Sequence, residues 1–495
     1  MNKAAVAGMA VVLGAGVQAG TKPNVLMICV DDLKPVFGAY GFGWVHSPNL
    51  DRLAARGMRF DRAYCNQAVC GPSRYNLLTG LRSTTTGLYD LRTGFREVNP
   101  DAVTLPQYFM QNGYRVEGVG KIFHIGHGNY GDDASWSVPF HPDKVVDYVL
   151  EESTGGQLTR EEAFFSNQML DRINTLPRGA AWEKADVPDE AYADGRIAVE
   201  AIRRLRRAAT NDTPFFLAVG FVKPHLPFCA PVKYWDLYKP EQFALTERDT
   251  PPDGAPPYAE KPKSWEIGNF KPLPEDGNNI PEEMQRTLIH GYFAALSYMD
   301  AQLGKVLDAL DETGLADSTL IMLWGDHGYH FGDHGTWTKH TNYEQDNRIP
   351  LIFVAPGSVS PGSHTEAFAE SVDIYPTLAE LAGLPKPAVP QGLDGMSLMP
   401  VLKNPAVSLR NHTYHAYNRG KRVGRAIRSD RYLMVEWKVP DHPETSAEYE
   451  LYDYRVDKLE KKNVAGTMPE VLSQMKAILA AYPEAAPVGK KGKKQ

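Results

Sequence analysis

The chain has 495 residues and a formal net charge of −7, from 53 Lys and Arg against 60 Asp and Glu. Hydrophobic residues at 43% and charged residues at 23% are ordinary globular values, which exclude a collagen, a coiled coil and a mostly disordered chain. The mild acidity argues against nucleic-acid binding, because proteins of that class usually present a basic face. Four cysteines are too few for a disulfide scaffold in a chain of this length. We therefore expect a large soluble enzyme.

The N-terminal residues 1–19 predict a secretory signal peptide. Lys3 supplies a positive start, residues 4–17 form an apolar run, and residues 17–19 offer a small-residue cleavage site. A membrane anchor is the alternative, but the run falls short of the ~20 residues of a spanning helix and is rich in Ala and Gly. We therefore expect no membrane association and a periplasmic or secreted mature protein.

The next part of the chain alternates between two patterns. Apolar runs without alternation predict strands buried on both faces of a parallel sheet, at residues 24–30, 114–119, 214–221, 319–324 and 350–355. Amphipathic patterns between them predict helices at residues 105–112, 193–208 and 294–313. Such alternation predicts an α/β fold, with a mainly parallel sheet flanked by helices.

After about residue 404 the pattern changes to one typical of a smaller α+β subdomain. Residues 425–437 and 448–455 predict strands of an antiparallel sheet, and residues 468–481 predict a closing helix. The expected division is a signal peptide at 1–19, a catalytic domain at 20–404, a C-terminal subdomain at 405–485 and a disordered basic tail at 486–495.

Polar side chains follow the ends of several predicted strands. In open α/β sheets, ligands bind beyond the carboxyl ends of the strands, and parallel strands bring those ends to one edge. We therefore expect one polar site assembled from distant residues, namely Asp31, Asp32, Lys121, His124, His225, Asp326 and His327. Residues 249–279, rich in Pro, Gly and charge, predict a long surface excursion near its mouth.

The segment at residues 70–80, Cys-Gly-Pro-Ser-Arg-Tyr-Asn-Leu-Leu-Thr-Gly, is the most informative one. Pro72 suits the first turn of a helix. Cys70 would then lie at a helix N-terminus, where free N–H groups and the helix dipole favour an anion. Arg74 could direct its guanidinium at the same anion. A turn before an ordinary amphipathic helix is the alternative that these residues leave open.

This segment resembles the signature of type I sulfatases, Cys-x-Pro-Ser-Arg followed by Leu-Thr-Gly, whose cysteine a dedicated maturation enzyme oxidises to formylglycine. Asp31-Asp32 and Asp326-His327 resemble the two metal pairs of that family. Gly-Lys-Ile-Phe-His at residues 120–124 departs from the Gly-Lys-Trp-His of many sulfatases, which places the histidine at 124. With residues 221–227 and Trp-Thr-Lys-His at 337–340, this variant resembles the iduronate-2-sulfatase-like branch of the alkaline phosphatase superfamily.

The resemblance implies a metal held by Asp31, Asp32, Cys70, Asp326 and His327. Three carboxylates suit Ca²⁺, whereas a histidine leaves Mn²⁺ or Zn²⁺ open by ligand type alone, and the family favours calcium. Hydrated formylglycine from Cys70 would attack the sulfur of a sulfate ester. The residues implied to surround the sulfate are Arg74, Lys121, His124, His225 and Lys339, with His225 or Lys339 as the acid for the leaving oxygen.

The resemblance thus implies an exported sulfatase that acts on a sulfated carbohydrate and depends on the maturation enzyme as a partner. A phosphodiesterase or phosphonate monoester hydrolase on the same scaffold is the alternative, because such relatives can use the same formylglycine. We expect Lys223 to be a solvated loop charge outside the site, and Trp337 to be either packing or a sugar platform. Asp333, His334 and His340 belong to a polar loop in which they satisfy one another or line the entrance.

Overall fold

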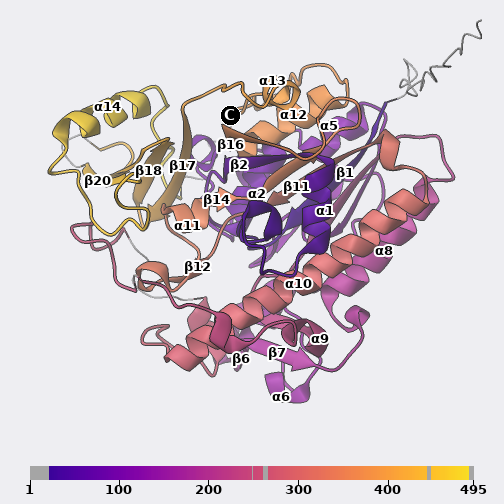
Figure 1. Ribbon diagram of the computed structural model, residues 1–495, viewed down its shortest axis with the longest axis horizontal. Helices are drawn as coiled ribbons and strands as arrows, with labels where there is room; N and C mark the ends of the chain where they lie inside the picture. Colours follow the sequence, from indigo (N-terminus) through magenta and orange to yellow (C-terminus); the bar gives the residue numbers. More distant parts are fainter. Residues whose placement is uncertain (1–21, 248, 260–265, 443–446, 490–495) are drawn as a thin grey trace, which may run out of the picture.

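The computed structural model describes residues 22–247, 249–259, 266–442 and 447–489, and the expected signal peptide lies outside them. An eight-stranded sheet forms the centre, in the order β14-β2-β15-β11-β1-β8-β3, with β16 paired to β2 (Figure 1). Its strands are β1 (Asn24–Val30), β2 (Met58–Tyr64), β3 (Arg115–Gly120), β8 (Phe215–Phe221), β11 (Thr319–Gly325), β14 (Arg348–Ile349), β15 (Leu351–Val354) and β16 (Ser363–Glu370).

Four predicted strands, β3, β8, β1 and β11, lie side by side and run parallel. The fifth, β15, pairs with β11 in the antiparallel direction, so the sheet is mixed. The reason is the connection between them. Trp324 near the end of β11 faces Leu351 at the start of β15, so the chain re-enters the sheet from the edge at which it left.

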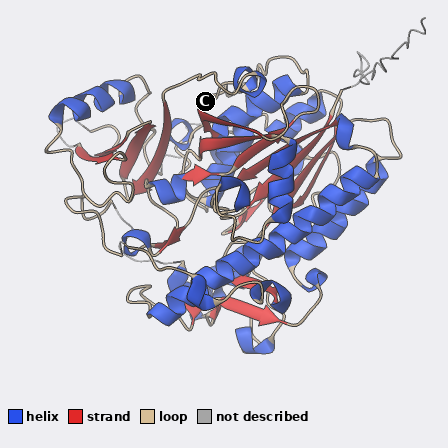
Figure 2. Ribbon diagram, viewed as in Figure 1, coloured by secondary structure: helices blue, strands red, loops and turns tan. Residues whose placement is uncertain are grey.

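Helices cover both faces of this sheet (Figure 2). Because side chains alternate along a strand, Leu26 and Ile28 of β1 pack in one core with α1 (Pro48–Arg56), α8 (Ala193–Ala208) and α10 (Glu282–Glu312). Met27 and Cys29 pack in the other core, with α2 (Cys70–Thr79), α5 (Leu105–Gln111), α12 (Ile374–Leu381) and α13 (Met399–Lys403). Helix α10 begins well before the predicted residue 294: Glu282 and Glu283 are exposed and residues 284–287 are half-buried, but the residues from Leu288 onward are already buried, so the prediction also missed part of its buried face.

A four-stranded antiparallel sheet forms the C-terminal part, as predicted. It consists of β17 (His412–Arg419), β18 (Arg422–Ser429), β19 (Tyr432–Lys438) and β20 (Glu448–Asp453), and α14 (Pro469–Leu479) packs on it. The predicted single run 425–437 is a hairpin that turns between β18 and β19. Packing continues past the expected boundary at 485, because Ala486 N donates to Thr84 O, whereas residues 490–495 lie outside the described residues.

A buried ion-pair cluster joins this subdomain to the central sheet. Glu370, at the end of β16, accepts from Arg82 Nη2 at 2.7 Å and forms an ion pair with Arg410 Nη1 at 2.9 Å. Its other contacts are with Asn66 and with the backbone N–H of Tyr414 on β17. The two sheets are therefore connected through one carboxylate that is fully buried.

Short elements complete the described chain. The helices are α3 (Ser83–Thr86), α4 (Phe95–Val98), α6 (Glu151–Thr154), α7 (Arg160–Ser166), α9 (Val232–Trp235) and α11 (Glu344–Asn347). The strands are β4 (Ile125–Gly126), β5 (Asn129–Tyr130), β6 (Gly179–Ala180), β7 (Trp182–Ala185), β9 (Phe228–Pro231), β10 (Phe270–Lys271), β12 (His330–Phe331) and β13 (Trp337–Thr338). Within the described ranges, none of the helices combines the length and apolar character that a bilayer crossing requires.

Candidate active site

Two pairs of polar residues meet at the carboxyl ends of β1 and β11. These strands are parallel and in register, with Val30 opposite Gly325, so Asp31 and Asp32 lie beside Asp326 and His327. The backbone N–H of Asp32 donates to Asp326 Oδ1 at 2.9 Å. Asp32 has a φ of 56°, a left-handed conformation that few residues other than glycine adopt. The strand ends thus bring the two predicted metal pairs together.

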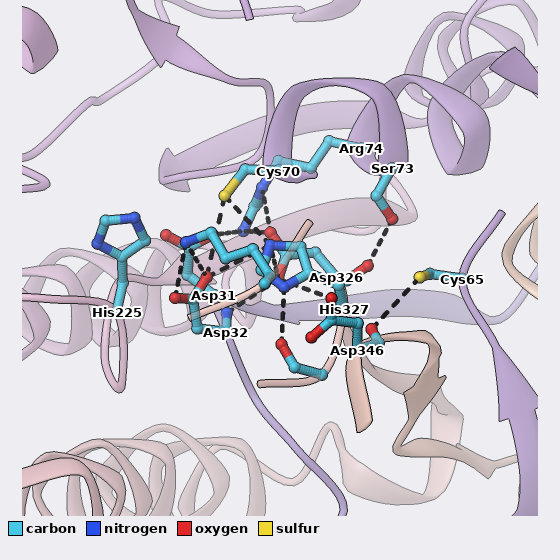
Figure 3. Close-up of polar contacts among 12 residues, drawn as sticks. Asp31, Asp32, Cys65, Cys70, Ser73, Arg74, His225, Asp326, His327 and Asp346 are labelled. Atoms are coloured by element: carbon cyan, nitrogen blue, oxygen red, sulfur yellow. Dashed lines mark hydrogen bonds and ion pairs between the residues drawn. The ribbon is translucent and has the colours of Figure 1, made fainter. Parts of the chain in front are cut away.

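Cys70 is the first residue of α2, and its thiol faces these pairs (Figure 3). The Sγ atom lies 3.3 Å from His327 Nε2 and 3.9 Å from Asp32 Oδ1. All ten residues of α2 are buried, so the alternative of an ordinary amphipathic helix is wrong. Burial, followed by the charge of Asp31, raises the pKa of the Cys70 thiol well above its usual value, so the unmodified cysteine is a neutral thiol.

Potential metal ligands form two overlapping groups around Cys70. Asp31, Asp32 and His225 lie with it in one group, and Asp326 and His327 lie with it in the other. Within each group the ligand atoms are all within 4.8 Å of one another, and every residue is buried. The structure thus brings all five predicted metal residues together and adds His225 to them.

Arg74 lies one turn after Cys70, but it contacts carboxylates of the chain itself. Its Nη2 is 2.8 Å from Asp31 Oδ1 and 3.0 Å from Asp326 Oδ2, and its Nη1 donates to the carbonyl oxygens of Lys121 and Ile122. The side chain is 0% exposed. The guanidinium nitrogens of Arg74 are therefore already paired with carboxylate and carbonyl oxygens of the chain itself.

Two lysines approach the tandem aspartates. Lys121, which follows β3, pairs with Asp31 Oδ2. Lys339, which follows β13, donates to both oxygens of Asp32 at 2.8 and 3.0 Å, and to Glu266 Oε1 at 2.7 Å. Both ammonium groups are almost fully buried. Three buried carboxylates therefore face three buried cations, which are Arg74, Lys121 and Lys339.

The three carboxylates differ in how well these cations compensate their burial. Burial alone would raise the pKa of Asp31, but Lys121 and Arg74 outweigh it and hold the pKa well below its usual value. Burial dominates at Asp32, whose pKa is raised to about 6, and at Asp326, whose pKa is also raised. A divalent cation would favour the ionised form of both. This donor set, hard oxygens with one imidazole, fits calcium.

A pocket of about 410 Å³ opens above Cys70 and contains the remaining predicted residues. His124 and His225 line it, with His124 Nε2 3.2 Å from His127 Nδ1 and His225 Nε2 3.4 Å from Glu266 Oε1. Burial lowers the pKa of both His124 and His225 well below the usual value. The neighbouring His127 and Lys121 lower the pKa of His124 further, and Lys339 lowers the pKa of His225 further. Both imidazoles are therefore neutral in the substrate-free protein.

Several residues of this pocket were not predicted from the sequence. Glu161 lies on the short helix α7, Glu266 and Asn269 come from a segment without a regular pattern, and Tyr417 comes from β17 of the C-terminal subdomain. Glu266 and Asn269 do belong to the excursion predicted to lie near the site mouth. The only available signal for them was that segment's unusual length.

Lys223 was wrongly predicted to be a solvated charge. Only 2% of the residue is exposed, and its Nζ donates to His225 O at 3.0 Å and to Pro227 O at 2.6 Å. The ammonium thus holds the loop that carries His225. Trp337 is buried at the apolar core, so it packs and offers no sugar platform. His334 contacts Glu460 at 3.2 Å, whereas His340 lines the pocket.

A mixed sheet flanked by helices, with polar residues gathered past its parallel strands, defines an α/β fold, and its solved structural neighbours place it in the alkaline-phosphatase-like class. A solved structure described as in complex with its substrate, D-glucosamine-2-N,6-O-disulfate, superposes with a TM-score of 0.72 at 22% identity, covering 93% of this chain and 97% of that one. At that identity the match shows the fold alone.

Family and sequence comparisons identify the chain further. The sulfatase family model matches residues 23–384, and the C-terminal model of N-sulphoglucosamine sulphohydrolase matches residues 332–484. An iduronate 2-sulfatase of Mus musculus is 39% identical over 396 residues, 74% of this chain and 69% of its own length. A sulfatase of Formosa agariphila is 32% identical over 482 residues, 94% of this chain and 87% of its own length. The chain belongs to the sulfatase family, whose members are sulfuric ester hydrolases.

Proposed function

We propose that the protein hydrolyses a sulfate ester of a sulfated carbohydrate, with formylglycine at position 70 and a bound calcium ion. The observation that carries the proposal is the position of Cys70, 3.3 Å from His327 Nε2 and 3.9 Å from Asp32 Oδ1 at the base of a pocket. Asp31, Asp32, Asp326 and His327 would hold the calcium ion. A maturation enzyme would supply the formylglycine.

These two groups would supply chemistry that the twenty amino acids lack: hydrated formylglycine would provide a hydroxyl nucleophile, and Ca²⁺ would lower the pKa of that hydroxyl and offset the charge of the sulfate. The chain's own residues do the rest. Arg74 fixes Asp31 and Asp326 from below. Lys339 and His124, which line the pocket, and Lys121, which pairs with Asp31, would bind and orient the sulfate group.

His225 is the proposed proton donor to the leaving oxygen. Its Nδ1 hydrogen-bonds the carbonyl of Leu226, so the ring carries a proton there and exchanges the catalytic proton at Nε2. Glu266 lies 3.4 Å from Nε2, where its carboxylate stabilises the protonated ring. A bound sulfate ester adds negative charge beside this histidine and so raises its pKa toward the range of a proton donor.

A phosphodiesterase or phosphonate monoester hydrolase is not favoured. The relatives at 39% and 32% identity are named sulfatases. Parallel assays with a sulfate ester and a phosphodiester of the same alcohol test the choice. Faster turnover of the phosphodiester would contradict the proposal.

The experiment that tests the proposed function measures sulfate release from defined sulfated oligosaccharides by residues 20–495, co-expressed with a formylglycine-generating enzyme. Cys70→Ala is expected to abolish release, because it removes the only precursor of the nucleophile. Cys229→Ala is the matched control, since Cys229 is also a buried free thiol but lies in the apolar core. Turnover that persists in Cys70→Ala would refute the nucleophile.

We also propose that the protein is exported to the periplasm or secreted, on the sequence of residues 1–19. Expression of the full chain, followed by N-terminal sequencing of the exported form, tests this. The mature protein is expected to begin near residue 20. Retention of the intact N-terminus in the cytoplasm would contradict it.

A further inference from the structure

One wall of the pocket has no part in holding the sulfate or the metal. It is built by Glu161, Phe164 and Phe165 of α7 and by Asn269, which lies three residues after Glu266. Glu161 is 5% exposed, yet it lines the pocket. A carboxyl group buried to this extent needs hydrogen-bond partners, because leaving it unsatisfied costs free energy.

A chain of hydrogen bonds fixes the orientation of this carboxyl group. Arg160 Nη1 donates to Asn269 Oδ1 at 3.2 Å, which determines which way the Asn269 amide faces. Asn269 Nδ2 then donates to Glu161 Oε1 at 2.7 Å. Over the described ranges, no protein donor reaches Glu161 Oε2. One oxygen is thus held by the protein, and the other is available to a molecule in the pocket.

We propose that Glu161, oriented by Arg160 and Asn269, recognises a hydroxyl group of the leaving sugar and so selects carbohydrate sulfates over aryl and quaternary-ammonium sulfates. The inference rests on the proposed sulfatase function and adds the specificity of its leaving group. An aryl ring or a trimethylammonium group has no hydroxyl to meet Oε2. A sugar presents several hydroxyls, each of which both donates and accepts.

Burial and the charged groups around Glu161 determine the protonation state of its carboxyl group. Burial and the neighbouring Glu266 carboxylate raise the pKa of Glu161 to about 8, while Asn269, Arg160 and Lys339 oppose the shift. At neutral pH the carboxyl is therefore largely protonated and uncharged, so it donates a hydrogen bond and neither attracts an ammonium group nor repels a sulfate. Above about pH 8 it ionises and loses this donor.

The test compares a sulfated sugar with an aryl sulfate in the mature, formylglycine-containing enzyme. Glu161→Ala is expected to raise KM for the sugar sulfate about tenfold, the effect of losing one buried hydrogen bond. KM and kcat for the aryl sulfate, which serves as the internal reference for folding and maturation, stay at the wild-type values. Glu152→Ala is the control, because Glu152 is an exposed glutamate that does not line this pocket.

A second variant separates recognition from packing. Glu161→Gln keeps the shape of the side chain and a hydrogen-bonding group at every pH, so its KM for the sugar is expected to stay close to the wild-type value at pH 7 and to change little through pH 8. Equal losses on the sugar and aryl sulfates in Glu161→Ala would assign Glu161 a structural role and overturn the proposal. So would an unchanged KM for the sugar, or a wild-type enzyme that cleaves only the aryl ester. A wild type that releases sulfate from neither substrate would instead refute the proposed function.

Discussion

Replacing Arg74 by methionine removes a cation that contacts both Asp31 and Asp326. The guanidinium is 0% exposed and lies 2.8 Å from Asp31 and 3.0 Å from Asp326, and methionine fills a similar volume without the charge. Removing one partner of a buried ion pair costs about 3–5 kcal/mol, because the remaining charge stays buried without compensation. We therefore expect the variant to be markedly less stable.

This cost translates into a measurable melting shift. An unfolding entropy of about 2.1 cal/mol/K per residue over roughly 470 residues gives about 1 kcal/mol/K, so Tm falls by about 3–5 °C if the molecule unfolds as one unit. The assay is differential scanning calorimetry of calcium-free protein at neutral pH, where only the chain's own cations face the carboxylates. Arg74→Lys, which keeps the charge, is expected to lose less.

The matched control is an arginine in an exposed ion pair. Arg52 contacts Asp308 at 2.6 Å, but the two side chains are 37% and 55% exposed. Such pairs contribute about 0–1 kcal/mol, so Arg52→Met should shift Tm by about 1 °C or less. Equal shifts for Arg74→Met and Arg52→Met would refute the reasoning. So would an Arg74→Met variant with wild-type Tm and only a raised KM, which would make Arg74 a sulfate ligand.

Three further predictions follow from other contacts. Lys223→Met is expected to displace the loop that carries His225, so kcat should fall for a sugar sulfate. The value for an activated aryl sulfate should fall little, because its leaving oxygen needs no proton. Lys184→Met, at an exposed ion pair, is the control. Burial would raise the pKa of Glu370, but Arg82 and Arg410 outweigh it and hold the pKa well below the usual value. Its contribution to stability is therefore present above about pH 4.5 and lost as pH falls further, and Glu370→Gln should flatten this acid limb of Tm against pH. Removal of calcium by a chelator should lower Tm and stop sulfate release, and added Ca²⁺ should restore both.

Each of these predictions has a result that would contradict it. Equal losses on both substrates in Lys223→Met would show a general folding defect instead of a positioning role. An acid limb that is unchanged in Glu370→Gln would mean that another carboxylate controls acid unfolding. Full activity in the presence of a strong chelator would exclude a required metal.

The parallel half of the sheet was predictable because its strands are buried on both faces and so appear as unbroken apolar runs. Strand β2 alternates between buried and half-buried residues and carries Arg59, Asp61 and Arg62, so it lacks such a run. The direction of β15 was not predictable either, because it depends on where the long connection after β11 ends. The local sequence pattern indicates which residues are buried, whereas the direction of a strand depends on the path of the whole chain.

The same distinction applies to the candidate site. Asp31, Asp326 and His327 follow predicted strands, so their meeting at one edge could be expected before the structure was known. The first-turn position of Arg74 indicated an anion ligand, but spacing cannot show that the guanidinium is already paired with the carboxylates of Asp31 and Asp326. Glu161 and Asn269 are far apart in sequence and lie outside any motif, so only the folded chain brings them together.

The central claim is that position 70 carries the nucleophile as a formylglycine beside the metal carboxylates. Mass spectrometry of the peptide that spans residue 70, taken from enzyme with measured sulfatase activity, tests it most directly. The account predicts the mass of an aldehyde in place of the thiol, in a fraction that rises in proportion to specific activity across preparations. A fully active preparation in which this peptide retains an unmodified cysteine would contradict it.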